Sequence, residues 1–138
     1  MIQIQTAPQI KREVLLNWEA WSPKRGEIYL VDLGEGMDCE QRGLRPFVIL
    51  SNDVGNTMAS ILTGASITTR KKGLPKIHVS VGRESGLKND SFILCEHIRT
   101  ISKRRFFSRG NPVYVGVLSK NKIIELESAI RFELGFIT

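Results

Sequence analysis

Two polar residues stand at the ends of apolar segments, where they could act on a phosphate group. Arg45 precedes Pro46 and the apolar run at residues 47–50, and Thr68 closes the segment ASIT at residues 65–68. A residue before proline is biased toward extended backbone, so Arg45 is expected where a loop enters a buried strand. Arginine stays charged and its fork of donors matches phosphate oxygens, and a threonine hydroxyl can donate to the same oxygens. The pair would suit stabilisation of a phosphate on which charge develops.

RNA cleavage is a reaction that such a pair could support without a metal. The ribose 2′-hydroxyl beside the scissile phosphate is an internal nucleophile already held near its target. The protein must take the proton of that hydroxyl, stabilise the phosphate and protonate the departing 5′-oxygen. Glu40, five residues before Arg45, could be the base or orient another group. A surface carboxylate paired with Arg42 or Arg45 is an equally open interpretation.

Other catalytic classes lack their motifs. There is no GxSxG, no HExxH and no glycine-rich phosphate loop, and His78 and His97 are nineteen residues apart. Four acids do cluster, and a Mg²⁺ nuclease could use such a group. They are Asp32, Glu35, Asp38 and Glu40. A solvated loop between strands is the favoured interpretation, so no metal site and no other cofactor is expected.

Length and composition favour a single cytoplasmic domain without membrane contact. The 138 residues, 41% of them hydrophobic, can bury one core. No apolar run reaches the roughly eighteen residues of a membrane span, and no secretory signal is evident. Cys39 and Cys95 are isolated, which predicts neither a zinc site nor a disulfide framework. Both are expected to be reduced thiols, with Cys95 buried in a strand.

The positive charge is concentrated in the middle of the chain. Thirteen of the twenty Lys and Arg residues lie in residues 40–110, and this segment has a formal net charge of +8. Residues 1–39 have a net charge of −2 and residues 111–138 a net charge of 0, which gives +6 for the whole chain. If these cations share a face, a polyanion is the natural partner. Charge alone does not choose between nucleic acid and an acidic peptide.

The chain between its two ends reads as many short strands. Apolar and β-branched runs are separated by Gly, Asn, Asp and Lys clusters that suit turns. The candidate strands are residues 27–33, 46–51, 60–68, 77–81, 91–96, 98–102 and 113–117. This spacing predicts a mainly β (α+β) fold, a small and strongly curved antiparallel sheet or barrel.

Helical periodicity marks both ends of the chain. Near the C-terminus, apolar residues recur at helical spacing between an N-cap at Ser119 and a stop at Gly135. They are Ile123, Leu126, Ile130 and Leu134. In the first two dozen residues, a second apolar stripe ends at Ser22 and Pro23 and comprises Ile10, Val14, Trp18 and Trp21. Packing of the two tryptophans onto the body of the protein is favoured over a partner-binding face.

Five separated segments, in order, carry a resemblance to a known family. They are KRGEIYLVDL (24–33), EQRGLRPFVILSNDVGN (40–56), ASITTRKKGLPKIHVSV (65–81), GLKNDSFILCEHIRTISKRR (86–105) and the closing helix. Together they resemble the MazF/PemK type of toxin endoribonuclease. The resemblance runs nearly without gaps from about Lys24 to the C-terminus and leaves residues 1–23 as an N-terminal helical extension. Residues 24–138 are then the endoribonuclease domain.

The resemblance implies a fold, an activity and partners. The fold would be an SH3-like barrel of the CcdB/PemK type with a C-terminal helix, and the active form a homodimer. The activity would be that of the toxin in a type II toxin–antitoxin pair, cutting single-stranded RNA without metal to leave 2′,3′-cyclic phosphate and 5′-hydroxyl ends. An acidic MazE-like antitoxin would neutralise it. The alternative is a non-catalytic toxin or a nucleic-acid or peptide-binding module on the same barrel, as in gyrase-poisoning toxins.

The resemblance also assigns site residues. The catalytic arginine and threonine of the family fall on Arg45 and Thr68, and Glu40 is the third catalytic candidate. The remaining candidates are expected to contact substrate along the RNA groove. They are Cys39, Gln41, Asn52, Thr69, Arg70, Lys71, His78 and His97. Because His97 stands where many relatives carry glutamine, and Cys39 where a small hydroxyl residue or glycine is common, the base preference is expected to differ.

Overall fold

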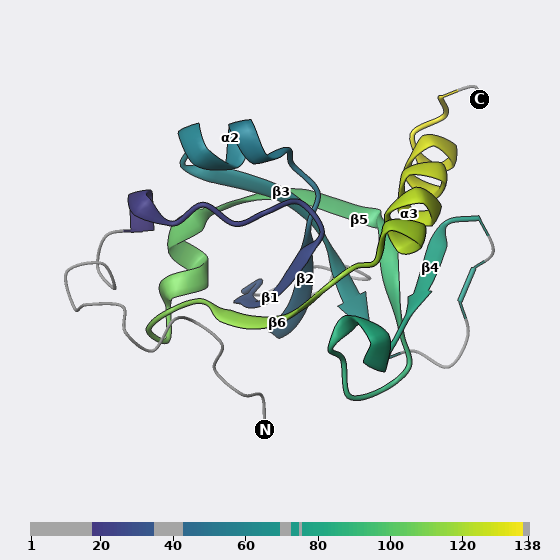
Figure 1. Cartoon of the computed structure of the whole chain (residues 1–138), viewed down its shortest axis with the longest axis horizontal. Coiled ribbons are helices and arrows are strands. Elements are labelled where there is room, and N and C mark those ends of the chain that lie inside the picture. Colours follow the sequence, from purple (N-terminus) through teal and green to yellow (C-terminus); the bar gives the residue numbers. More distant parts are fainter. Residues whose placement is uncertain (1–17, 35–42, 70–72, 75, 137–138) are drawn as a thin grey trace.

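A curled antiparallel sheet with a C-terminal helix forms the body of the molecule (Figure 1). The computed structural model describes residues 18–34, 43–69, 73–74 and 76–136. Six strands follow one another in the sheet in the order β4-β5-β3-β2-β1-β6. Their bounds are β1 Glu27–Asp32, β2 Leu44–Ile49, β3 Ile61–Thr68, β4 His78–Val81, β5 Ser91–Ser102 and β6 Val113–Val117. The predicted mainly β fold with a closing helix is confirmed.

Two helices and three short 3₁₀ turns complete the described elements. They are α2 Asp53–Met58, α3 Lys120–Glu133, η1 Trp18–Ala20, η2 Arg83–Ser85 and η3 Lys103–Phe107. The ends of α3 are as predicted, because the Ser119 side chain accepts a hydrogen bond from the Lys122 N–H and Gly135 adopts a φ of 78°. The short helix α2 was not among the predicted elements.

The sheet buries a hydrophobic cluster on each face. One cluster joins β-strand residues to the inner side of α3, which stands beside β4 and β5 in Figure 1. It includes Ile28, Val48, Ile67, Ile93 and Leu126, each at most 1% exposed. The other cluster lies toward η3 and includes Val31, Phe47, Ile49, Leu62 and Phe106. Alternate residues of β2 therefore enter different clusters, which fixes the orientation of the strand.

Strand β5 bends sharply in its middle. Two predicted strands, residues 91–96 and 98–102, are one continuous element. Its first part pairs with β4 on one edge and with the end of β3 on the other, and its second part pairs with β3. Ala65 and Ile67 of β3 are separated by one residue, but their partners Ile98 and Ile93 are separated by four. The extra residues form a bulge, which curls the sheet. Cys95 lies in this bend, and burial raises the pKa of its thiol to about 12, so the predicted buried thiol is confirmed.

The described part of the N-terminal segment packs onto the sheet domain. The Trp21 ring lies 5.0 Å from the Tyr29 ring, 4.9 Å from Phe106 and 5.7 Å from Phe107. Asn56, fully buried, donates from its side-chain amide to the Pro23 carbonyl at 3.0 Å. Trp21 thus contacts the body of the protein, whereas Ile10 and Val14 of the predicted stripe lie outside the described residues.

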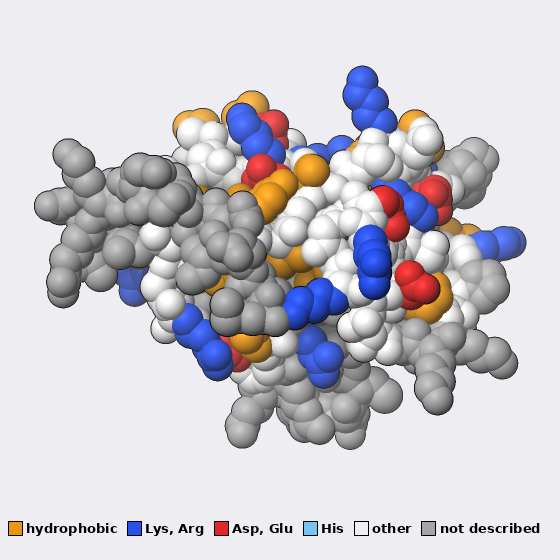
Figure 2. Space-filling view, turned by 60° about the horizontal axis from the view of Figure 1, so that its bottom comes forward, with side chains coloured by type: hydrophobic (Ala, Val, Ile, Leu, Met, Phe, Trp, Pro, Cys, Tyr) orange, Lys and Arg blue, Asp and Glu red, His pale blue; other side chains and the backbone are white. Residues whose placement is uncertain are grey.

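Some of the cationic side chains of the central segment make structural contacts within the domain. Figure 2 shows Lys and Arg side chains dispersed over the visible face, with Asp and Glu among them. The Arg104 guanidinium stacks over Trp18 at 4.9 Å, and the Lys76 ammonium lies 5.4 Å from the Phe132 ring. At least two of these cations therefore contact aromatic rings of the domain itself. None of the described helices is long and apolar enough to span a membrane.

Candidate active site

Arg45 and Thr68 come together where β2 and β3 separate. The hydrogen-bonded register pairs Ile49 with Gly64 and Phe47 with Ser66. Continued by two residues, the same register sets Arg45 opposite Thr68. Pro46 stands between Phe47 and Arg45 and has no N–H to donate to a neighbouring strand. The pairing of β2 with β3 therefore ends just before Arg45 and Thr68. The two side chains, both half-buried, face a space instead of a continuous sheet.

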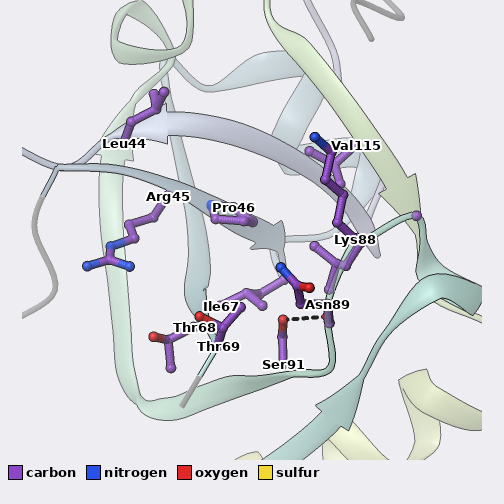
Figure 3. Close-up of a pocket in the computed structure, with 12 residues that line it drawn as sticks. Leu44, Arg45, Pro46, Ile67, Thr68, Thr69, Lys88, Asn89, Ser91 and Val115 are labelled. Carbon is purple, nitrogen blue, oxygen red and sulfur yellow. Dashed lines mark hydrogen bonds between the residues drawn. The ribbon is translucent and has the colours of Figure 1, made fainter. Parts of the chain in front are cut away.

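That space is a cavity of about 320 Å³. Its walls come from the start of β2, the end of β3, the loop before β5, and β6 (Figure 3). The lining residues include Arg45, Thr68, Thr69, Lys88, Asn89 and Ser91. In the view of Figure 3, Arg45 and the threonines lie on one side of Pro46, and Lys88 and Asn89 lie on the other. All charged side chains among the described lining residues are cationic, which favours an anionic ligand.

Comparison with known proteins identifies the family to which this fold and site belong. The sequence matches the family described as PemK-like, MazF-like toxin of type II toxin-antitoxin system over residues 24–134. The chain belongs to this family. It is similar to Endoribonuclease MazF of Staphylococcus epidermidis, with 37% identity over 115 residues that cover 81% of this chain and 91% of the relative.

Solved structures of a MazF protein and of another endoribonuclease share the fold. MazF (Form-I) from Deinococcus radiodurans has a TM-score of 0.70 at 22% identity, covering 83% of this chain and 98% of that chain. An endoribonuclease from Mycobacterial species, solved in complex with its cognate antitoxin, has a TM-score of 0.67 at 23% identity, covering 84% and 98%. The curled sheet and closing helix are thus those of a PemK/MazF-like toxin.

Five of the predicted site residues lie outside the described part of this PemK/MazF-like toxin. They are Cys39, Glu40, Gln41, Arg70 and Lys71. Of the residues that the structure describes, Arg45, Thr68 and Thr69 line the cavity together. Asn52, His78 and His97 do not line it, and two of these three have an internal structural role.

Asn52 is a helix cap. Its side-chain oxygen accepts a hydrogen bond from the Gly55 N–H at 2.8 Å at the start of α2. This interaction satisfies a backbone donor that the first helical turn would otherwise leave without a partner. Asn52 is exposed, and its predicted contact with substrate stays a prediction beside this structural role. The sequence SND before a short helix was a signal for this cap.

His78 is sequestered beneath the sheet surface. Its side chain is 0% exposed, its Nδ1 accepts from the Leu74 N–H at 2.8 Å, and its Nε2 lies 2.7 Å from a Glu96 carboxylate oxygen. Since Nδ1 accepts, the proton resides on Nε2 and is donated to Glu96. Both ring nitrogens are occupied, so His78 acts as a clamp between β4, β5 and Leu74, and its predicted place in the RNA groove stays a prediction.

The hydrogen bond from His78 changes the pKa of the Glu96 carboxyl group. Burial alone would raise the pKa of Glu96, but the hydrogen bond from His78 and a backbone hydrogen bond outweigh burial and lower that pKa below its ordinary value of 4.5. Glu96 is therefore held ionised as the acceptor of the His78 proton. His97, the next residue along β5, is half-buried and lies outside the cavity lining.

Three polar residues of the cavity, Lys88, Asn89 and Ser91, were missed by sequence reasoning. Lys88 and Asn89 stand in the segment GLKNDS, which contributed to the resemblance but not to the site. An exposed lysine and asparagine in a turn have no periodic signal of their own. Within the described ranges, no group of three or more His, Cys, Asp or Glu side chains is placed to hold a metal ion.

Proposed function

We propose that this PemK/MazF-like toxin is a sequence-selective endoribonuclease that cuts single-stranded RNA by attack of the ribose 2′-hydroxyl. The observation that supports the proposal is the cavity that Arg45 and Thr68 line from adjacent strands. The similar protein of Staphylococcus epidermidis is named an endoribonuclease. Products would carry 2′,3′-cyclic phosphate and 5′-hydroxyl ends, and no metal would be required because the nucleophile is part of the substrate.

Each catalytic candidate has a distinct duty in this proposal. The Arg45 guanidinium would neutralise charge that builds on the phosphate, and the Thr68 hydroxyl would donate to the same oxygens. Glu40 would take the proton of the 2′-hydroxyl. Thr69 would contact substrate from the cavity wall, together with candidates outside the described residues, namely Cys39, Gln41, Arg70 and Lys71. His97 would read a base from beside the cavity.

The proposal extends to partners and organisation. The toxin would act as a cytoplasmic homodimer, with residues 24–138 as the nuclease domain and residues 1–23 as an extension. An acidic antitoxin tail would occupy the same cationic cavity as RNA, since both ligands are polyanionic. A structural neighbour was solved in complex with its cognate antitoxin, which supports an antitoxin as a partner of this chain.

One experiment separates a nuclease from a binding module. The purified full chain is incubated with mixed-sequence single-stranded RNA in EDTA, and the product ends are sequenced. The expected result is cutting at a short recurrent sequence with cyclic phosphate ends. Uncut RNA would overturn the nuclease proposal and leave a non-catalytic toxin, whereas cutting that is abolished by EDTA would overturn the metal-independent mechanism.

A further inference from the structure

The cavity has a second cationic wall opposite Arg45. The segment between η2 and β5 contributes Gly86, Leu87, Lys88, Asn89 and Ser91 to the lining. Lys88 and Asn89 are exposed, and Figure 3 shows them on the other side of Pro46 from Arg45. None of the catalytic candidates lies in this wall.

Close backbone packing fixes this segment against β6. A side-chain carbon added to Gly86 would collide with the Val115 carbonyl oxygen, and one added to Gly116 would collide with the Ser85 carbonyl oxygen. The two backbones are therefore in direct contact, an approach that only glycine permits. The φ of 93° at Gly86 turns the chain from η2 toward the cavity. The wall is a rigid part of the fold.

Lys88 is held between two anchored neighbours. On one side, Leu87 is 7% exposed and enters the cluster beneath α3. On the other, the hydroxyl of Ser91, itself 4% exposed, donates to the Asn89 carbonyl at 2.9 Å. The backbone at Lys88 is thereby positioned, while its four-carbon stem stays free to place the ammonium. A fixed backbone with a flexible side chain lets the ammonium follow the phosphates of a polyanion whose position varies.

The ammonium of Lys88 is not committed to any carboxylate in the described part of the chain. The ion pairs there join Arg25 to Glu127, His78 to Glu96 and Lys122 to Glu125. Other central cations are engaged elsewhere, as with Arg105, whose guanidinium donates to the Asp32 carbonyl at 3.3 Å. Lys88 and Arg45 are the charged residues among the described lining residues, one from each wall.

We propose that Lys88 is a substrate-binding residue that contacts a backbone phosphate next to the one held by Arg45. The inference rests on the proposed function, because RNA supplies the row of phosphates. Lysine binds phosphate as a point charge without demanding one geometry, whereas arginine offers a directional fork. Arg45 thus suits the reacting phosphate, and Lys88 suits a neighbour whose charge is unchanged during the reaction. Lys88 contributes equally to ground state and transition state.

Steady-state kinetics of Lys88→Ala test this role. Loss of uniform binding raises KM while kcat stays constant. KM for single-stranded RNA is expected to rise about tenfold, with kcat within about twofold of wild type. Lys88→Arg should recover most of the affinity. Arg83→Ala is the matched control, because Arg83 is an exposed cation of the adjacent η2 turn that does not line the cavity. It should leave KM unchanged.

Salt dependence gives a readout that a merely structural role would not move. Binding of a mixed-sequence 2′-O-methyl RNA, which lacks the nucleophilic hydroxyl, is measured against salt concentration for wild type and Lys88→Ala. Removal of one phosphate contact lowers the slope of log affinity on log salt by about 0.7 for a single strand. Arg83→Ala should retain the full slope.

The outcomes separate this inference from the proposed nuclease activity. Unchanged KM and salt slope in Lys88→Ala would overturn the inference, and so would a loss confined to kcat, which would place Lys88 in the chemistry. If wild type cuts no RNA, the nuclease proposal fails, but a slope that depends on Lys88 still supports the phosphate contact. Absence of binding to 2′-O-methyl RNA by wild type would overturn the phosphate contact as well.

Discussion

Arg45 and Thr68 line one cavity from adjacent strands, at positions that the β2–β3 register sets opposite one another. The ladder ends at the pair Phe47–Ser66, and Pro46 withholds the donor that would extend it. Fully buried Phe47 anchors the strand directly behind the site. A guanidinium and a hydroxyl are thus presented from a rigid edge, which limits the reorganisation needed when a phosphate acquires charge.

Replacement of Arg45 by alanine should abolish most cleavage. The expected decrease in kcat is about 10² or more, the magnitude of a lost donor to a developing oxyanion. Arg45→Lys should recover only part of the rate, because an ammonium keeps the charge but lacks the planar fork. Initial rates on single-stranded RNA measure both, with circular dichroism to verify folding. Turnover at the wild-type rate in Arg45→Ala would remove Arg45 from the site.

Thr68→Val should also lower kcat with little change in shape. The substitution removes one neutral donor, so a smaller decrease of about tenfold is expected. Thr100→Val is the matched control, since Thr100 is an exposed strand threonine whose hydroxyl contacts Thr63 at 3.1 Å, outside the cavity lining. Equal rates in both variants would show that the Thr68 hydroxyl takes no part in catalysis.

The cap assigned to Asn52 predicts a loss of stability without a loss of RNA affinity. Asn52→Ala should lower the free energy of unfolding by about 1 kcal/mol, whereas Asn52→Asp should retain most of it because aspartate caps equally well. Denaturant unfolding and KM are measured on both variants. A raised KM in Asn52→Ala at unchanged stability would instead support the substrate contact that the sequence predicts for Asn52.

Local patterns predicted the strands, α3 and the Arg45–Thr68 pair because each depends on periodicity, a cap or a proline nearby in sequence. Lys88 was missed because its importance arises from packing of Gly86 against β6, about thirty residues away in the chain. The RNA-groove position of His78 was predicted from the family resemblance alone, and the structural contacts of its ring were not predicted. Its ring nitrogens hydrogen-bond the Leu74 N–H and the Glu96 carboxylate, contacts that strand periodicity does not encode.

The aromatic contacts of Trp21 predict that the segment before the family-matched region stabilises the domain. Trp21→Ala should lower the free energy of unfolding by about 3 kcal/mol, the low end for a lost tryptophan because this ring is half-buried. Trp18→Ala is the matched comparison, with one cation–π contact to Arg104 and an expected loss of about 0.5–1 kcal/mol. Chemical denaturation measures both. Equal losses would contradict the packing role of Trp21.

The lowered pKa of Glu96 predicts a pH-dependent share of the stability. Ionised Glu96 accepts from His78 in the native state, so its contribution is complete above the ordinary carboxyl pKa of 4.5 and is lost as the pH falls through the lower folded-state value. Glu96→Gln should therefore be less stable than wild type by about 1 kcal/mol at pH 7, and the difference should shrink below pH 4.5. Urea unfolding at several pH values between 7 and the acidic range measures this stability difference.

Glu125→Gln is the matched control, because Glu125 is an exposed carboxylate paired with Lys122, and it should show almost no such difference. A gap for Glu96→Gln that stays constant down to strongly acidic pH would mean that the carboxylate charge does not stabilise the clamp.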